Sequence, residues 1–376
     1  MTNLDLFGHT GVEVRTQGIK YAGSKKKLLG PILHLSKKTG AKAVFDGFAG
    51  STRVSQAFAQ SGYSVISNDK AVWSKVLGGC YLTSRESDGH YQELIDHLNN
   101  VKPFFGWFSE YYGGQTDNLG NSLGVDGLKK PFQLKNTKKL DAIRSEIDNL
   151  SLSEDEKNVA LTSLILALEK VDNTLGHYVS YLRCWSKRSY KSLRLELPQI
   201  LRTNASHQCL QEDAIELAST TDAHLAYYDP PYGSNNEKMP PSRVRYDAYY
   251  HFWKTLILND QPKTFGAACR RADSSDKIAS SCFEDFRQDE MGSYIAVKAI
   301  DTLIKRSAAK DIILSYSSGG RATKQELLSI LGKNGTVTDV LRISHKQNVM
   351  AHMRWTDLWS KNPDEGHFEY LFLLRR

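Results

Sequence analysis

In three parts of the chain, short apolar runs typical of strands alternate with segments whose apolar residues recur at helical spacing. This alternation predicts an α/β fold. The runs expected to form strands are residues 43–46, 63–67, 225–228, 311–316, 337–343 and 368–374. The segments expected to form helices around them are residues 28–35, 54–58, 215–218, 296–305 and 323–331. A basic, histidine-containing loop separates the last two strands, so we expect them to form a terminal antiparallel pair.

Two stretches interrupt this alternation. Residues 74–205 contain helical spacing over 137–150, and a capping box at Ser153 opens a longer helix that ends near Val171. We therefore expect an inserted, mostly helical lobe there. Residues 233–290 form a second, polar interruption. The parts assigned to the sheet domain are residues 19–73, 206–232 and 291–376.

Composition adds a weak indication of a partner. The chain has 376 residues and a formal net charge of +7, and its excess of basic residues lies in local clusters. Such clusters mildly favour a polyanionic partner. A solvated basic face is the alternative. No apolar run approaches the length of a membrane span, and no signal peptide is evident. We expect a cytoplasmic protein that does not contact membranes.

The cysteines and histidines carry little chemistry in this pattern. The five cysteines are an odd number without close pairs, so we expect reduced thiols and no zinc site: Cys80, Cys184, Cys209, Cys269 and Cys282. The histidines show no metal-ligand spacing, so no metal is expected. The chain also has neither a Gly-x-Ser-x-Gly elbow nor a phosphate-cradling Gly-x-x-x-x-Gly-Lys.

A glycine turn and an acid indicate a nucleoside site at the first two strands. The turn Asp46-Gly47-Phe48-Ala49-Gly50 directly follows the first strand, where backbone can approach a ligand closely. Asp69 closes the second strand, at the position where nucleotide-binding units hold ribose hydroxyls. Close packing of the turn and local capping by Asp69 are the alternatives. A nucleoside without phosphates is the ligand that the pattern favours.

The segment Asp229-Pro230-Pro231-Tyr232 follows the apolar strand at 225–228. The prolines end the strand, so Asp229 should stand at its carboxyl end, the edge where open α/β sheets bind ligands. A proline turn with a capping acid is the alternative.

Basic residues interleaved with aromatic residues suit phosphate contact and base stacking. One such cluster has Trp185 and Tyr190 among its basic residues, and the second interruption contributes two arginines. A solvated loop is the alternative. The candidates for nucleic-acid contact are Arg183, Lys187, Arg188, Lys191, Arg243 and Arg245.

Three motifs together resemble those of the Dam-like N6-adenine DNA methyltransferases, which use S-adenosylmethionine: Tyr21-Ala22-Gly23-Ser24-Lys25, the turn 46–50 and the segment 229–232. The resemblance implies a Rossmann-like methyltransferase sheet. It also implies that Tyr21 and Lys25 line the cofactor's methionine end, Asp69 holds the ribose and Asp213 meets the adenine edge. The residues expected to wrap the cofactor are Asp46, Gly47, Phe48, Ala49 and Gly50. Many members read Pro-Phe-x-Gly-x-Gly where this chain has Gly47 to Thr52.

By the same resemblance, the catalytic residues would be Asp229, Pro230 and Tyr232. The Asp229 carboxylate and the Pro230 carbonyl would accept the two amine hydrogens of a flipped-out adenine, and Tyr232 would stack on the base. Residues 74–205 would read the target sequence in duplex DNA, and residues 233–290 would lie over the flipped base. A cognate restriction endonuclease acting separately is the expected biological partner.

Three alternatives remain open at the level of sequence. An RNA adenine methyltransferase would carry the same Asp-Pro-Pro-Tyr, since enzymes that act on either polymer share it. An N4-cytosine methyltransferase more often has Ser at the position of Asp229. A catalytically silent nucleic-acid-binding protein on the same scaffold would not need the acids Asp46, Asp69 and Asp229.

Overall fold

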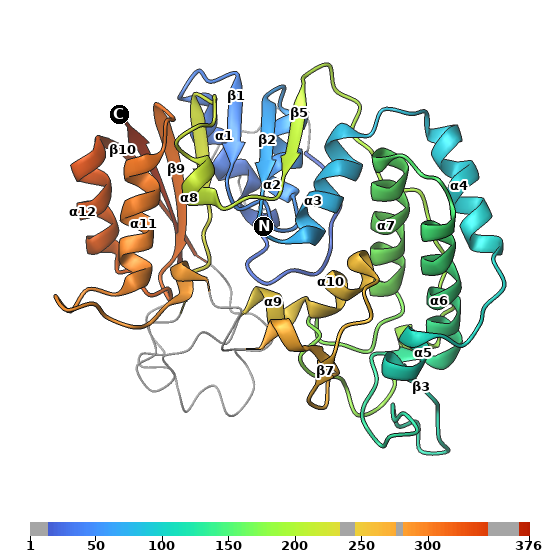
Figure 1. The fold of residues 1–376 in the computed structure, drawn as a ribbon. Coiled ribbons are helices and arrows are strands. Elements are labelled where there is room, and N and C mark those ends of the chain that lie inside the picture. Colours follow the sequence, from blue (N-terminus) through green and yellow to red (C-terminus); the bar gives the residue numbers. More distant parts are fainter. Residues whose placement is uncertain (1–13, 234–244, 276–280, 345–367) are drawn as a thin grey trace, which may run out of the picture.

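The computed structural model describes residues 14–233, 245–275, 281–344 and 368–376. Within this part of the chain, seven strands form one mixed sheet in the order β10-β11-β9-β6-β1-β2-β5 (Figure 1). The strands are β1 (Ala43–Asp46), β2 (Ser64–Asn68), β5 (His207–Leu210), β6 (Leu225–Tyr228), β9 (Asp311–Ser317), β10 (Thr336–Ser344) and β11 (Phe368–Arg375). The five strands from β9 to β5 are parallel, whereas β11 runs antiparallel to β9 and β10. The α/β sheet with a terminal antiparallel pair is confirmed.

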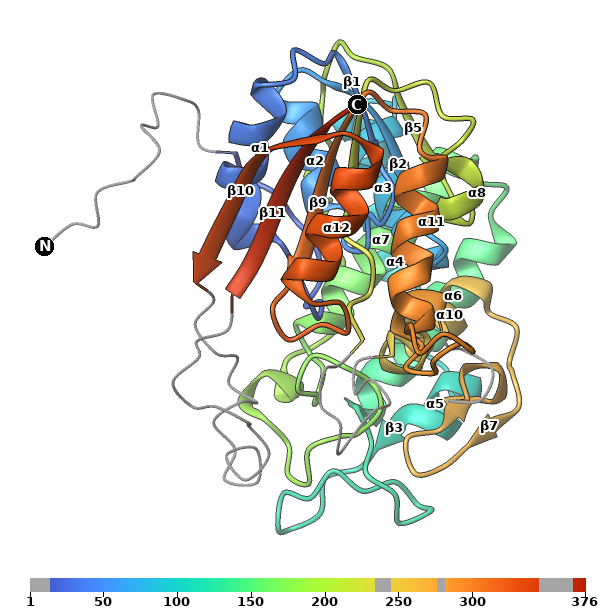
Figure 2. The same ribbon diagram turned by 90° about the vertical axis from the view of Figure 1, so that its left-hand side faces the viewer.

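Helices cover both faces of the sheet because successive side chains along each strand point to opposite faces. On β6, Tyr227 belongs to the core beneath α1, α2 and α3, whereas Tyr228 belongs to the core beneath α8, α11 and α12. Figure 2 shows α11 and α12 on one side of β9 to β11. These helices are α1 (Leu29–Lys37), α2 (Arg53–Gln60), α3 (Val72–Gly78), α8 (Ala214–Leu217), α11 (Ile295–Arg306) and α12 (Lys324–Asn334).

The helical lobe lies beside the sheet (Figure 1). Its helices are α4 (Asp88–Asn100), α5 (Trp107–Tyr112), α6 (Leu134–Asn149) and α7 (Glu154–Glu169). Ser153 forms the expected capping box with Glu156 at the start of α7. Two short strand pairs also occur, between β3 (Gly113–Gly114) and β4 (Phe132–Gln133), and between β7 (Thr264–Phe265) and β8 (Arg270–Arg271).

Part of the second interruption packs into this lobe. It forms α9 (Tyr246–Tyr249) and α10 (His251–Leu258), which the polar character of the segment did not predict. On α10, the ring of Phe252 stacks on Tyr178 with centroids 4.7 Å apart. The buried Arg144 of α6 donates to the carbonyls of Leu256 and Ile257, at distances of 2.7 and 3.0 Å. The helix forms because its aromatic residues fill the core of the lobe and Arg144 satisfies its last carbonyls.

The sequence pattern also did not predict the strand at residues 207–210. Strand β5 lies at the edge of the sheet, and none of its residues is fully buried. An edge strand pairs on one side only and tolerates polar residues such as His207 and Gln208, which removes the apolar signal.

Candidate active site

Acidic residues stand at the carboxyl ends of neighbouring parallel strands. Asp46 is the last residue of β1, Asp69 follows β2, and Asp229 follows β6, which pairs with β1. Asp213 follows β5 and caps α8, where its side chain accepts from the Ile215 amide. The strand register therefore gathers acids that are distant in sequence at one edge of the sheet, as the sequence predicted.

A cavity of about 520 Å³ opens at this edge. Of the expected cofactor residues, those that line it are Tyr21, Lys25, Gly47, Phe48, Ala49, Gly50, Asp69 and Asp213. Asp229 and Pro231 also line it, while Pro230 and Tyr232 are not among the lining residues. The volume is in the range of small-molecule sites, and the lining combines aromatic rings with several acidic side chains.

The glycine turn allows the backbone to face this cavity. A Cβ on Gly47 would come within 2.8 Å of the Tyr228 ring, and a Cβ on Gly50 within 2.8 Å of the Tyr21 ring. Gly50 also has a φ of +51°, a left-handed conformation that favours glycine. The turn differs in sequence from many members of the resembling family, yet it keeps glycine at the two positions where a side chain would collide.

Asp69 holds the turn in place. Its carboxylate accepts from the Gly50 amide at 2.8 Å and from the Ala71 amide at 2.9 Å. Burial raises the pKa of Asp69 to about 6, although these two bonds favour the charged form. Each oxygen has a further lone pair, so Asp69 could also accept from a ligand hydroxyl.

Asp46 is the first residue of the turn, and its side chain is fully buried. One of its oxygens accepts from Ser55 Oγ at 2.6 Å, and the other has no hydrogen-bond partner among the described residues. Burial raises the pKa of Asp46 to about 7. An orphaned buried carboxylate oxygen is costly, and a bound ligand's cationic group near this site would reduce that cost.

Asp229 belongs to a buried charged cluster. Lys25 Nζ lies 2.8 Å from one of its oxygens, and the Tyr232 hydroxyl bonds to the other. The ring of Tyr232 lies against Tyr316 and beneath the Lys25 ammonium. Burial raises the pKa of Asp229 to about 6 despite the Lys25 ion pair. Lys25 thus directs its charge at Asp229 as well as at the cavity.

This pKa predicts an acid limit on turnover. In the role that the resemblance implies, Asp229 must be ionised to accept amine hydrogens, so at saturating S-adenosylmethionine we expect the rate to fall as the pH drops through about 6. An ordinary aspartate would give a limit near pH 4. The pH profile of single-turnover methylation measures it, and a profile flat from pH 7 to pH 5 would contradict this assignment.

The basic residues predicted to contact nucleic acid are distributed differently. Arg183, Lys187 and Lys191 are exposed, whereas Arg243 lies outside the described residues. Arg245 immediately precedes α9. Trp185 is buried at 7% exposure and packs against Gly114, so it is not free to stack on a base as expected, while Tyr190 is half exposed.

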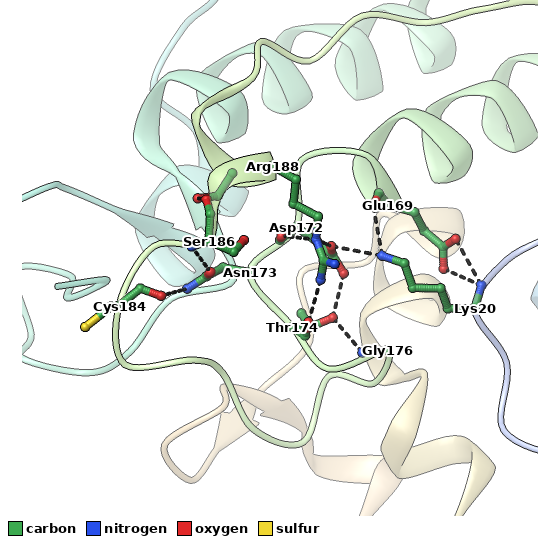
Figure 3. A network of polar contacts seen from close by, with 10 residues as sticks. Lys20, Glu169, Asp172, Asn173, Thr174, Gly176, Cys184, Ser186 and Arg188 are labelled. Atoms are coloured by element: carbon green, nitrogen blue, oxygen red, sulfur yellow. Dashed lines mark hydrogen bonds and ion pairs between the residues drawn. The ribbon is translucent and has the colours of Figure 1, made fainter. Parts of the chain in front are cut away.

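Arg188 is engaged within the protein (Figure 3). Its Nε lies 2.6 Å from the Asp172 carboxylate, and Nη2 donates to the Thr174 carbonyl. The same carboxylate lies 3.1 Å from Lys20 Nζ, and the backbone amide of Lys20 donates to Glu169. A phosphate contact by Arg188 would compete with these bonds, so its role here is to connect the basic loop to the segment before Tyr21.

We expect Asp172→Ala to lower the free energy of unfolding by about 2 kcal/mol, because it removes a buried acceptor shared by two cations. Thermal unfolding measures the change. Glu196→Ala is the control, since it removes only an exposed pair with Lys170 and should cost less than about 1 kcal/mol. Equal losses in the two variants would contradict a special role for Asp172.

Several cavity residues had no sequence signal. Trp73 and Tyr246 extend the aromatic lining, and Cys282, Phe283 and Glu284, which lie late in the second interruption, complete it. Burial raises the pKa of Glu284 to about 8. These residues reach the cavity only through tertiary packing, so spacing along the chain could not identify them.

The described ranges contain no group of three histidine, cysteine or acidic residues suited to a metal ion, and none of their helices is long and apolar enough to span a bilayer. The five cysteines all fall inside these ranges and are free thiols.

Comparison with known proteins identifies similar chains. The modification methylase StsI of Streptococcus sanguinis is 29% identical over 378 residues, which cover 95% of this chain and 52% of that protein. The type II methyltransferase M.FokI of Planomicrobium okeanokoites is 26% identical, with 95% and 53% covered. The type II methyltransferase M.NlaIII of Neisseria lactamica is 27% identical, with 95% and 99% covered. The chain thus spans about half the length of the first two relatives and nearly all of the third.

The family assignment rests on a match to the pattern of a whole family. The model of the D12 class N6 adenine-specific DNA methyltransferases matches residues 21–286, a stretch that contains the first motif, the glycine turn and Asp229 to Tyr232. The resemblance drawn from those three motifs is confirmed, and the chain belongs to the D12 class N6 adenine-specific DNA methyltransferase family.

Proposed function

We propose that this chain transfers a methyl group from S-adenosylmethionine to N6 of a flipped-out adenine in duplex DNA. The observation that carries the proposal is that Asp229, polarised by Lys25, lines the same cavity as Asp69 and the glycine turn. A methyl donor bound by the turn would thus lie next to the acid that receives the amine. Family membership supports the same reaction class.

The residues present fit S-adenosylmethionine. Asp69 would accept from the ribose hydroxyls, and Asp213 would meet the adenine edge. The turn at residues 46–50 would wrap the donor, with the orphaned Asp46 oxygen close behind it. When bound, the donor supplies a methyl group on a sulfonium, a carbon that an amine can attack.

The chain's contribution to the reaction is to activate that amine. The lone pair of an exocyclic amine is delocalised into the ring, so the nitrogen is a poor nucleophile while it is planar. The Asp229 carboxylate and the Pro230 carbonyl are both acceptors, and together they would take the two amine hydrogens and favour tetrahedral geometry. Inside a duplex the amine is out of reach, so the base must be flipped into the site.

We assign target recognition to residues 74–205, against which α10 of the second interruption packs. Arg183, Lys187 and Lys191 are exposed and would grip the phosphate backbone. The similar modification methylases support a restriction-modification role. A separately acting restriction endonuclease is the partner that we propose for it. Expression in a host that lacks adenine methylation tests the function: N6-methyladenine should appear in its DNA at one sequence, and unmodified DNA would contradict the proposal.

The exposed cations predict a measurable salt effect. Substituting Arg183, Lys187 and Lys191 together by Gln should lower the slope of log affinity against log salt by about 2 to 3, since each phosphate contact contributes about 0.9. Arg188→Gln is the matched control from the same loop, because its charge is already engaged by Asp172. It should change stability more than the slope. Equal slopes for all three proteins would rule out this loop as the phosphate contact.

A further inference from the structure

Glu369 stands at the active-site edge although it lies far outside the matched residues 21–286. It is the second residue of β11, which runs antiparallel to β9, with Glu369 opposite Ser317 near the end of that strand. An antiparallel strand begins where its parallel neighbours end, so the terminal strand pair brings its first residues to the carboxyl edge. Glu369 is buried at 4% exposure.

The Glu369 carboxylate shares its hydrogen-bond donors with Asp229. Lys25 Nζ lies 3.2 Å from Glu369 and 2.8 Å from Asp229, and its remaining hydrogen goes to the Gly23 carbonyl at 2.9 Å. The Tyr232 hydroxyl contacts Glu369 Oε1 and Asp229 Oδ1. Ser315 Oγ adds a contact of 3.3 Å to Glu369.

The number of hydrogens available for donation in this cluster makes Tyr232 the link between the two carboxylates. The three hydrogens of Lys25 are all used, and the Tyr232 hydroxyl has one hydrogen for two carboxylate oxygens. When both acids are ionised, that hydrogen can serve only one of them. A second proton arriving at Asp229 would satisfy the remaining contact.

We propose that Glu369 accepts the proton released by methyl transfer, receiving it from Asp229 through the Tyr232 hydroxyl. The inference rests on the proposed function. As the amine nitrogen bonds to the methyl carbon, the carbon–sulfur bond breaks and its electron pair stays on sulfur. One amine proton passes to Asp229 Oδ1. Asp229 then gives a proton to Tyr232 Oη while the Tyr232 hydrogen moves to Glu369 Oε1, so Asp229 is again ionised.

Charge balance in the buried site supports this route. Lys25 carries one positive charge and the two carboxylates carry two negative charges, so the cluster has a net charge of −1 before the reaction. A cationic donor beside it makes the sum zero. After transfer the donor is neutral, and a proton kept on Glu369 leaves the sum at zero. Buried charge is costly when it is not balanced, so retaining the proton is favourable.

The electrostatics of Asp229 agree with close coupling between the acids. Burial is the largest cause of its raised pKa, Lys25 opposes the shift, and the Glu369 charge adds to it. Tyr232 and Tyr227 face the same acid. A neutral residue at position 369 should therefore bring the pKa of Asp229 closer to its ordinary value.

Glu369→Gln tests the route, because the amide can keep the contacts to Lys25 and Tyr232 but is not a proton acceptor. We expect the single-turnover rate at pH 8 to fall about tenfold or more. Tyr232→Phe should lose a similar factor, and the double variant should lose no more than the worse single variant. Glu369→Asp restores the carboxylate and should recover part of the rate. Glu93→Gln, an exposed glutamate of α4, is the control and should not change the rate.

Two further results separate the possible failures. In the unliganded protein, infrared titration should place Asp229 protonation at lower pH in Glu369→Gln than in wild type, with Asp229→Asn identifying the band. A wild-type rate at pH 8 in Glu369→Gln, or additive losses in the double variant, would overturn the relay and leave the methyltransferase proposal standing. Wild-type protein that methylates no DNA would overturn both.

Discussion

Asp229→Ala should reduce methyl transfer about 10²- to 10³-fold while cofactor affinity stays within about threefold of wild type. The variant removes the carboxylate that we propose accepts an amine hydrogen, and single groups that stabilise charge in a transition state contribute about 10² to 10³. The fold should survive, because Lys25 keeps its contacts with Glu369 and the Gly23 carbonyl. Single-turnover kinetics and calorimetric titration of the cofactor measure the two effects.

Two controls make this result specific. Asp229→Asn keeps one acceptor oxygen and should lose less rate than the alanine variant. Asp222→Ala alters an exposed aspartate just before β6 and should leave the rate unchanged. Loss of cofactor binding in Asp229→Ala that matches the loss of rate would mean that this acid holds the donor rather than the amine.

Asp69→Ala should weaken cofactor binding about 100-fold. The carboxylate holds the amides of Gly50 and Ala71, and the same oxygens would accept from the ribose. Hydrogen bonds to charged groups contribute about 1.5 to 3 kcal/mol each, so losing the ribose contact together with the shape of the turn accounts for this factor.

Calorimetric titration of S-adenosylmethionine measures the affinity of the Asp69 variants. Asp69→Asn keeps one acceptor and should fall between wild type and Asp69→Ala. The exposed Asp222→Ala is again the control. An affinity within threefold of wild type in Asp69→Ala would show that the donor does not contact this acid.

The sequence predicted the parts of the site that depend on strand ends. A short apolar run followed by an acid predicts both a buried strand and the edge that its last residue reaches, so Asp46, Asp69 and Asp229 could be assigned to one edge without coordinates. The glycine turn was predictable for the same reason. These features are local in sequence, and the parallel pairing of the strands brings them together at one edge of the sheet.

What the sequence could not predict depends on tertiary packing. Tyr246 lines the cavity because α9 brings its ring to 5.2 Å from the ring of Tyr21. Glu369 reaches the same edge because β11 runs antiparallel to β9. Arg188 lies in a basic stretch that suits phosphate contact, but its guanidinium forms an ion pair with Asp172. Trp185 interleaves with basic residues in sequence yet is buried beneath them. Spacing along the chain does not encode such neighbours.

The most direct test of the central claim is nucleoside analysis after incubation with S-adenosylmethionine labelled in its methyl group. Purified protein would be incubated separately with duplex DNA and with total RNA, and each digest analysed. We predict label in N6-methyladenine from DNA that is lost in Asp229→Ala. Label from RNA alone would keep the chemistry and change the substrate, label in N4-methylcytosine would change the target base, and no label from either polymer would contradict the proposed activity.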